Sequence, residues 1–598
     1  MLQKAGMPIT ARRYYARAKT LPLVSAFAGL LLGYSLIYLF IGDFMEIKPG
    51  IPGEKEILAY VFIPLLFAAF AYVLAGQALL YYPQLIASTR KKHIDLTIQH
   101  SATYLYAMSK GGLNLYESLT SLGKNASIYG EAAVELGRIE RDMKLFGKSS
   151  LEAMQSLIET TPSSKMQEFL RGLVSVTNSK GDIAEYFRRK SQQYHAEAQN
   201  EQKLFLETLG VISEGYVVAL VAGPMFLIVV GIVMGMIGSG FTSMLYAVVY
   251  GFIPVASVAF LVFISTLSKT ASGKADLFIH KKEPSPFKDI PVIAGDAKKA
   301  DTLRQEIQKK RSLIWLKDPV KLFYLHPEKA LYMGLFIGAL YFIYHLWQAG
   351  FELLEVDRDL LFATLIAMLP FAVFYEAGSY RINHIENQMP GFLRKLANAS
   401  DAGLTLVKAI EMTLFSESGA LAAEVKKVLR EAKWGSPISA SLIRMSRRVR
   451  TIAMTRIVSL IVKASEASGN IAEVMNIAAD EAESEKKLKQ ARLAVTSVYL
   501  IIIYMAFFCF LFIAVILSRS FLPALSQGSI PGMGSGMGSG MGAGEIKQLM
   551  FHAALLNGFF SGLVAGEITE GSIASGVKHS IIMLLAAYIT FIFAVGLV

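Results

Sequence analysis

The sequence predicts an all-α protein: a polytopic helical membrane protein with two cytoplasmic helical-bundle domains related by internal duplication. Hydrophobic residues make up 53% of the chain and the mean hydropathy is +0.44, yet 18% of the residues are charged. Part of the sequence also occurs twice. Gly112–Leu115 returns as Gly403–Leu406, 291 residues later, and Gly181–Glu185 returns as Gly469–Glu473, 288 residues later. Each copy then runs through a charged stretch into a long apolar segment, so we expect two equivalent modules side by side in one chain.

The N-terminal segment predicts a membrane anchor that is retained. A basic stretch, residues 12–19, precedes an apolar run that is too long for a signal peptide and lacks a small-residue cleavage site. A membrane-spanning helix needs about 20 mostly apolar residues. Nine segments meet this requirement, near residues 21–42, 57–83, 211–236, 244–267, 330–347, 359–378, 494–519, 547–566 and 579–598. The eighth is the weakest, because three polar residues interrupt it (Lys547, His552 and Asn557).

The charged loops predict which side of the plasma membrane each segment faces. Cytoplasmic loops carry an excess of lysine and arginine. Residues 268–328 hold thirteen of these against eight acidic residues, whereas the loops at 43–56 and 348–358 are mainly acidic. Nine spans then place the N-terminus in the cytoplasm and the C-terminus outside.

This topology predicts seven parts in the chain. They are membrane spans 1–2 (residues 1–83), a first cytoplasmic domain (84–208), spans 3–4 (209–267), a basic cytoplasmic linker (268–328), spans 5–6 (329–378), a second cytoplasmic domain (379–493) and spans 7–9 (494–598). The last part includes a loop rich in glycine, methionine and serine, 520–546, which is too poor in bulky apolar residues to fold alone.

Both polar blocks are expected to be compact bundles of about six short helices. Apolar residues recur at spacings of three and four, as at Leu151, Met154 and Ile158, and glycine and proline mark the breaks between helices. No proline interrupts the last helix of either block before the following span. We therefore expect each of these helices to continue from the bundle into the membrane as a stiff lever.

Several classes of function find no support in the sequence. The net charge of +12 is explained by the positive-inside bias, so we expect no nucleic-acid partner. The single cysteine, Cys509, leaves no disulfide framework or Cys-rich metal site. The nearest approach to a phosphate-binding loop, Phe146–Ser149, has Asp142 where the first glycine is needed. We expect no catalytic site, no cofactor and no metal site, and hence no enzyme.

Basic clusters in both polar blocks are candidate binding surfaces. Arg188 and Arg189 lie in the first block, and the second block carries a denser cluster, Arg444, Arg447, Arg448 and Arg450. A solvated surface and attraction to anionic lipid headgroups are two explanations. We favour a third, a protein partner with an acidic face, because arginine suits multidentate pairing with carboxylates.

The repeated module resembles the type II secretion system F domain, through its Gly-Leu-x-Leu turn and its later Gly-Asp/Asn-Ile-Ala-Glu element. This family supplies the inner-membrane platform of type IV pili, type II secretion and archaeal flagella. The C-terminal residues match a pattern typical of archaeal platform proteins, which also have two F domains: Gly562, Gly566, Glu570, Gly571, Gly576, Lys578 and His579.

The resemblance implies a scaffold or rotor without enzymatic activity of its own. Its implied partners are a cytoplasmic hexameric ATPase, which docks on the soluble domains, and pilin or archaellin subunits, which are lifted from the lipid bilayer into a filament. A second copy of the chain is a further conceivable partner. The resemblance does not separate an archaellum from an adhesive pilus. The main alternative is a secondary transporter with duplicated halves, although such proteins usually carry polar residues near the bilayer midplane; a membrane enzyme ranks third.

Overall fold

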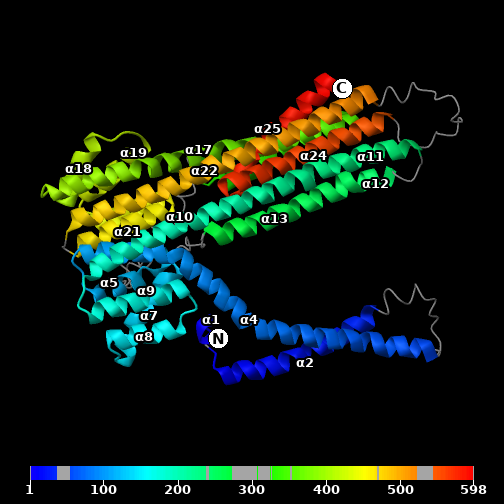
Figure 1. The fold of residues 1–598 in the computed structure, drawn as a ribbon. Coiled ribbons are helices and arrows are strands. Elements are labelled where there is room, and N and C mark those ends of the chain that lie inside the picture. The colour runs from blue at the N-terminus through cyan, green and yellow to red at the C-terminus, as the bar shows by residue number, and fades with distance from the viewer. Residues whose placement is uncertain are drawn as a thin grey trace. The chain divides into compact units, whose positions relative to one another are not determined.

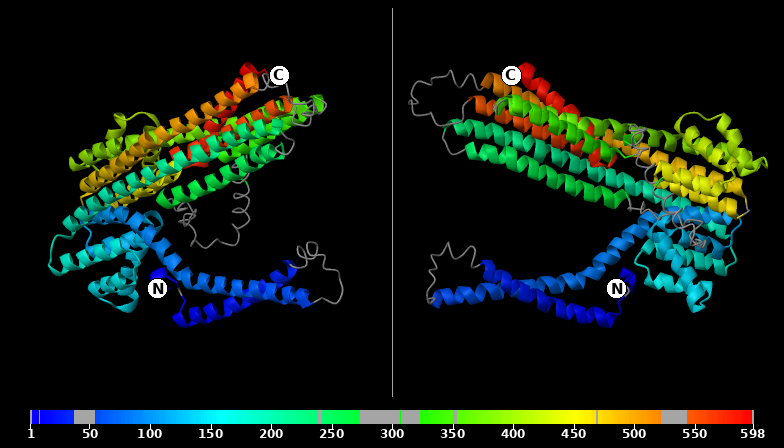
Figure 2. Two further views of the ribbon diagram at one scale, coloured as in Figure 1. Left: turned by 45° about the vertical axis from the view of Figure 1, so that its right-hand side comes forward. Right: turned by 180° about the vertical axis from the view of Figure 1, so that it is seen from behind.

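The computed structural model describes residues 2–7, 9–36, 54–237, 242–272, 306, 323–324, 326–349, 353–467, 470–521 and 543–596. Every regular element within these residues is a helix, as predicted. The chain divides into two compact units (Figures 1 and 2). The first comprises residues 1–195 and 466–470, and the second comprises 196–465 and 471–598.

The first unit begins with a helical hairpin. After the short helix α1 (Leu2–Ala5), α2 (Ala11–Leu36) packs along the first part of α4 (Glu54–Lys110). The backbones approach closely at Gly29, where an added Cβ atom would lie 2.7 Å from the carbonyl oxygen of Phe67. Glycine at such a contact is typical of helices that pair within a membrane.

The first bundle follows directly from α4. It contains the end of α4, α5 (Leu115–Lys124), α6 (Ala126–Tyr129), α7 (Glu131–Phe146), α8 (Ser150–Thr160), α9 (Ser164–Asn178) and the start of α10 (Ile183–Tyr216). Asn114 and Ser149 begin α5 and α8 through capping boxes, in which each side chain bonds the glutamate three residues later. Large buried side chains such as Tyr104, Phe169 and Phe187 fill the interior.

The described residues of the second bundle have the same order of helices, without a counterpart of α6. It contains the end of α17 (Leu353–Asp401), α18 (Leu406–Phe415), α19 (Gly419–Lys433), α20 (Ile438–Val449), α21 (Ile452–Glu466) and the start of α22 (Ile471–Ile516). The starts of α5 and α18 are separated by the offset of the first repeated sequence element, and the starts of α8 and α20 by the shorter offset of the second. The short helix α6 of the first bundle lies between these points and accounts for the difference between the two offsets.

Eight helices in the described residues are long and apolar enough to cross a membrane, so the chain is a multi-pass membrane protein. They are Pro64–Lys110, Ile183–Ile232, Ser243–Ser268, Pro327–Gln348, Val356–Asp401, Ile471–Ser520, Gly544–Glu570 and Ile573–Val595. The segment expected to cross first, 21–42, lies only partly within the described residues, because α2 ends at Leu36. The count of nine therefore stays a prediction, as does the orientation, because the loops that set it lie largely outside the described residues.

Two of the three polar residues that weaken the eighth expected span, His552 and Asn557, have polar partners within the protein. They lie on α24 (Ala543–Glu570), most of which is buried. His552 lies 2.8 Å from Asp357 of α17, and Asn557 accepts a hydrogen bond from Ser561. Their partners are thus within the protein, which allows a membrane helix to contain them.

Two helices run from a bundle into a membrane span without a break, as expected. One is α22, which continues through a short π-helical stretch, Leu517–Phe521. The other is α10, which continues through the π-helical stretch Val217–Ala222 into α11 (Gly223–Ile237). The π-helical stretch ends just before Pro224, which has no N–H to donate and whose ring would crowd a regular helix. The boundaries between bundle and span stay predictions, because these helices pass through them.

The two lever helices pack against each other within the second unit. Gln202 on α10 donates a hydrogen bond to the carbonyl oxygen of Leu488 on α22, at 3.1 Å. Further along α10, Gly210 leaves room for Tyr499, whose hydroxyl would lie 2.2 Å from an added Cβ atom. In Figures 1 and 2, α22 runs alongside α24 and α25 (Ile573–Thr590). A displacement of one lever would therefore press directly on the other.

Candidate functional site

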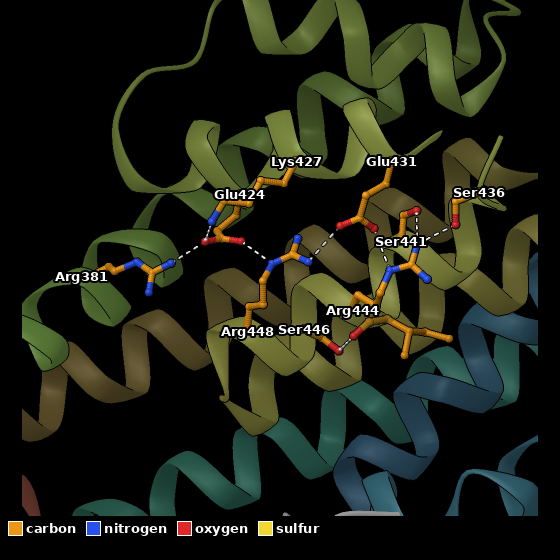
Figure 3. A network of polar contacts seen from close by, with 10 residues as sticks. Arg381, Glu424, Lys427, Glu431, Ser436, Ser441, Arg444, Ser446 and Arg448 are labelled. Atoms are coloured by element: carbon orange, nitrogen blue, oxygen red, sulfur yellow. Dashed lines mark hydrogen bonds and ion pairs between the residues drawn. The ribbon is translucent and has the colours of Figure 1, made fainter. Parts of the chain in front are cut away.

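The arginine cluster of the second bundle lies on α20, and two of its members face inward. Arg444 and Arg448 are one helical turn apart and both point to α19 (Figure 3). Arg448 donates from Nε to Glu424 at 2.7 Å and from Nη1 to Glu431 at 3.2 Å. Arg444 donates from Nε to Glu431 at 2.7 Å. These two arginines therefore join α19 to α20 within the bundle.

Arg444 also holds the turn between the two helices. Its Nη2 donates to the hydroxyl oxygens of Ser436, at 2.6 Å, and Ser441, at 3.0 Å. The side chains of Arg444 and Arg448 are only 36% and 29% exposed to solvent. Much of their hydrogen-bonding capacity is thus taken up inside the bundle, a role that the spacing of arginines in the sequence did not predict.

The other two arginines of the cluster lie at the end of α20. Arg447 is in its last turn, and Arg450 caps it in the left-handed conformation, with a φ of 62°. Nη2 of Arg450 lies 3.5 Å from Nε2 of His326, which precedes the membrane span α16 (Pro327–Ala349). Burial, and then the charge of Arg450, lower the pKa of His326, so its ring is neutral near pH 7. This end of α20 therefore lies beside the start of a predicted membrane span.

Arg188 and Arg189 form a separate basic surface at the start of α10. Both pair with Glu185, at 2.6 Å and 3.5 Å. The side chain of Arg189 is 71% exposed, so it remains open to a partner despite this pairing. Exposed pairs of this kind contribute little to stability.

The most deeply placed charges are two glutamates that the sequence analysis did not single out. Glu135 on α7 and Glu424 on α19 are almost fully buried. Glu135 pairs with Arg90 of α4, and Glu424 pairs with Arg381 of α17. The two arginines are 291 residues apart, the offset of the first repeated sequence element, so an alignment of the two copies could have revealed them; the two glutamates are 289 residues apart and do not align.

A second cation contacts each of these glutamates one turn further along its helix. Arg138 lies 3.3 Å from Glu135, and Lys427 lies 2.7 Å from Glu424. Burial alone would raise the pKa of Glu424, but hydrogen bonds from Lys427 and Arg448 outweigh burial and lower it. The carboxylate of Glu424 is therefore charged near neutral pH, and it forms ion pairs with several cations at once. A buried carboxylate that pairs with several cations stabilises the packing of the helices that carry them, because removing one partner leaves the others unpaired.

The C-terminal glycines let α24 and α25 pack backbone to backbone. An added Cβ atom on Gly562 would lie 2.2 Å from the Ser580 nitrogen, and one on Gly566 would lie 2.1 Å from the Gly576 nitrogen. Ser575 and Ser580 then donate hydrogen bonds across the contact, to carbonyl oxygens of α24. Any larger side chain at these glycines would separate the two helices.

The remaining residues of the C-terminal pattern hold the turn of this hairpin. Lys578 pairs with Glu570, at 2.8 Å, and with Glu376 of α17, at 2.9 Å. His579 bonds the hydroxyl of Tyr504 on α22 through Nδ1, at 2.9 Å. Gly571 adopts a positive φ of 67° and closes the turn. The pattern thus ties the hairpin to both α17 and α22.

The segment that approaches a phosphate-binding loop has a structural role. Gly147 ends α7 in the left-handed conformation, and Ser149 caps α8. Lys148 bonds Ser156, at 2.8 Å, and pairs with Asp142, at 3.7 Å. In the second bundle, a cavity of about 10 Å³ is lined by apolar side chains alone, including Phe392, and is too small for a ligand.

Comparisons with known proteins agree with the duplication. A family model described as "Type II secretion system (T2SS), protein F" matches the chain twice, over residues 102–231 and 392–518. The second match is slightly shorter than the first, as expected if the second copy lacks a counterpart of α6. An uncharacterized protein of the archaeon Methanocaldococcus jannaschii is 25% identical over 528 residues, which cover 86% of this chain and 82% of the relative. No solved structure matches the chain significantly.

Proposed function

Since the chain belongs to the protein F family of the type II secretion system and carries two of its domains in tandem, we propose that it is the membrane platform for assembly of a type IV pilus-like or archaellum filament. Family members are membrane platform proteins of secretion and pilus systems. Here the platform couples a cytoplasmic hexameric ATPase to the insertion of pilin or archaellin subunits from the bilayer. The protein has no enzymatic step of its own in this scheme.

The observation that carries this proposal is the pair of lever helices. Each F domain sends one unbroken helix from its bundle into a membrane span, α10 with α11 in the first copy and α22 in the second. The levers contact each other through Gln202 and Leu488, and α22 contacts the C-terminal hairpin through Tyr504 and His579. A force applied to either bundle would therefore reach packed membrane helices.

The proposal requires both bundles to face the cytoplasm, where the ATPase is. The basic linker 268–328 and the acidic loops at 43–56 and 348–358 support this orientation. With nine spans, the N-terminus is cytoplasmic and the C-terminus is outside.

We assign ATPase docking to the basic surfaces of both bundles. Arg188 and Arg189 provide one, and Arg447 and Arg450 on α20 provide another, with Arg444 and Arg448 beneath it. Arg444 and Arg448 form ion pairs with Glu431 and Glu424 inside the bundle. Charge reversal at these two arginines would therefore disturb folding as well as docking. Charge reversal at Arg189 tests docking with less effect on folding, because this side chain is mostly exposed.

Co-purification tests the proposed function. The protein is solubilised from membranes that also contain a secretion-type ATPase from the same organism. We expect the ATPase to be retained, and to be lost as salt rises, because the Debye length falls to about 3 Å at 1 M. A wild-type protein that retains no ATPase at low salt, and whose deletion leaves surface filaments unchanged, would contradict the proposal.

A further inference from the structure

Each bundle exposes bulky apolar side chains at the same place, the end of α7 in the first bundle and the end of the corresponding helix, α19, in the second. In the first bundle, Leu145 and Phe146 are 71% and 67% exposed; in the second, Trp434 is 87% exposed. All three lie outside the predicted membrane spans, so lipid tails do not cover them. Isolated exposed apolar residues are common, but the recurrence of bulky ones at matching positions in both copies is not explained by folding.

The two helix ends also match in charge and backbone. Arg141 and Lys144 precede the apolar residues of the first copy, and Arg430 and Lys433 precede Trp434 in the second, each one residue closer to the glycine that follows the helix. Gly147 and Gly435 then end the two helices at positive φ, 64° and 88°. These left-handed residues turn the chain sharply, which leaves the preceding apolar side chains outside the bundle.

The acidic residues of α19 turn away from this exposed end. Glu431 follows Arg430 directly, but it points inward and binds Arg444 and Arg448. Arg430 is exposed, and Lys433 pairs with Glu411 at 2.6 Å. The exposed surface of the helix end therefore combines an aromatic ring with cationic groups. Tryptophan and arginine are the residues that most often dominate protein interfaces.

The geometry of α19 and α20 directs this end away from the membrane boundary. The helices are antiparallel, since Glu424 pairs with Arg448 and Glu431 with Arg444. At one end of the pair, Glu424 binds Arg381, which lies just after a predicted span. Trp434 is about 15 Å beyond Glu424 along the helix, at about 1.5 Å of rise per residue. In Figure 3, Ser436 lies at the opposite end of the network from Arg381.

We propose that these two helix ends, Arg141–Phe146 and Arg430–Trp434, are docking knobs for a protein surface that has an apolar socket rimmed by carboxylates. The partner surface receives the ring of Trp434, or Leu145 and Phe146, in its socket, and its carboxylates pair with the flanking cations. Two knobs of the same design suit a partner built of repeated subunits, each of which presents one socket. The inference rests on the proposed function in taking the hexameric ATPase as that partner.

Quantitative binding of the purified ATPase to the full-length protein in nanodiscs tests the inference. We expect Trp434→Ala to weaken binding about tenfold, as the loss of a buried interfacial tryptophan does. The variant with both Leu145→Ala and Phe146→Ala should weaken binding likewise, and the combined variant should lose more than either. Because these side chains are exposed, all variants should keep the wild-type melting temperature.

Trp347→Ala is the matched control, because Trp347 is equally exposed, at 85%, but lies at the end of a membrane span. It should bind as the wild type does. Wild-type binding that Trp434→Ala leaves unchanged would overturn the inference while preserving the proposed function; no wild-type binding at all would refute the proposed function. A loss seen only in nanodiscs with anionic lipid, and not in zwitterionic ones, would also overturn it, by assigning Trp434 to lipid.

Discussion

Arg381 and Glu424 form an ion pair that ties the last part of α17 to α19, and the glutamate side chain is only 1% exposed. The same relationship joins Arg90 to Glu135 in the first bundle. Because the pair recurs in both copies, it is part of what specifies the F-domain fold. In both copies it fixes an inner bundle helix to the helix that arrives from the membrane.

Replacement of the buried glutamate should therefore destabilise its bundle. In Glu424→Gln, the side chain keeps its size but Arg381, Lys427 and Arg448 lose their shared counter-charge. We expect a loss of about 2–4 kcal/mol in the free energy of unfolding, because breaking a buried ion pair leaves uncompensated charges. Denaturant titration of the purified protein measures this loss. Asp480→Asn is the control, since its pair with Arg394 is well exposed and should contribute nothing measurable; equal stability of the Glu424 variant and this control would contradict the structural role.

Acid should weaken the second bundle through the same glutamates. For Glu424 and Glu431, burial raises the pKa, but hydrogen bonds from lysine and arginine outweigh it, so the folded-state pKa of each is lowered from about 4.5. Their stabilisation is therefore complete above that unfolded-state value and is lost as the pH falls through the lower folded-state values. In measurements from pH 7 to pH 3, the melting temperature should start to decrease once the pH is below about 4.5. The decrease with pH should be less steep in Glu424→Gln. A variant with the wild-type slope would show that other groups cause the acid sensitivity.

The glycine contact between α24 and α25 should not tolerate a branched side chain. In Gly566→Val, the added Cβ atom would lie 2.1 Å from the backbone nitrogen of Gly576, so the helices must separate. We expect a destabilisation of about 2–4 kcal/mol, because neither backbone can move aside cheaply. The midpoint of heat-induced aggregation in detergent, followed by size-exclusion chromatography, reports the change. Gly215→Ala on α10 is the control, because an added Cβ atom there meets nothing within 4 Å; similar losses in both variants would refute the close contact.

The sequence was sufficient to predict the helices and their duplication. Gly147 and Gly435 mark helix ends, and the apolar spacing at Leu151 and Met154 marks the buried face of α8. The small difference between the repeat offsets corresponds to one short helix, α6. These features depend on residues that are close together in the chain, so short-range sequence patterns are enough to predict them.

The direction of individual charged side chains could not be predicted in the same way. Arg444 and Arg448 look like a basic surface in the sequence, but α19 places Glu431 and Glu424 against them. Likewise, the polar residue His552 looks unsuited to a membrane span until Asp357 is seen beside it. Such pairings depend on which helices pack together, and residues far apart in the chain determine that. The internal repeat does contain part of this information, since the arginine of the buried ion pair recurs at the repeat offset.

The account depends most directly on both bundles facing the cytoplasm, because a cytoplasmic motor can reach only surfaces on that side. The single cysteine makes this measurable: in a Cys509→Ala background, one new cysteine is introduced at a time, at Ser179, Ser418 or Ser535. Ser179 and Ser418 are exposed residues of the first and second bundles, and Ser535 belongs to the loop 520–546. A membrane-impermeant maleimide should label Ser535→Cys on intact cells, and should label Ser179→Cys and Ser418→Cys only in inverted membrane vesicles. Labelling of either bundle on intact cells would contradict the account.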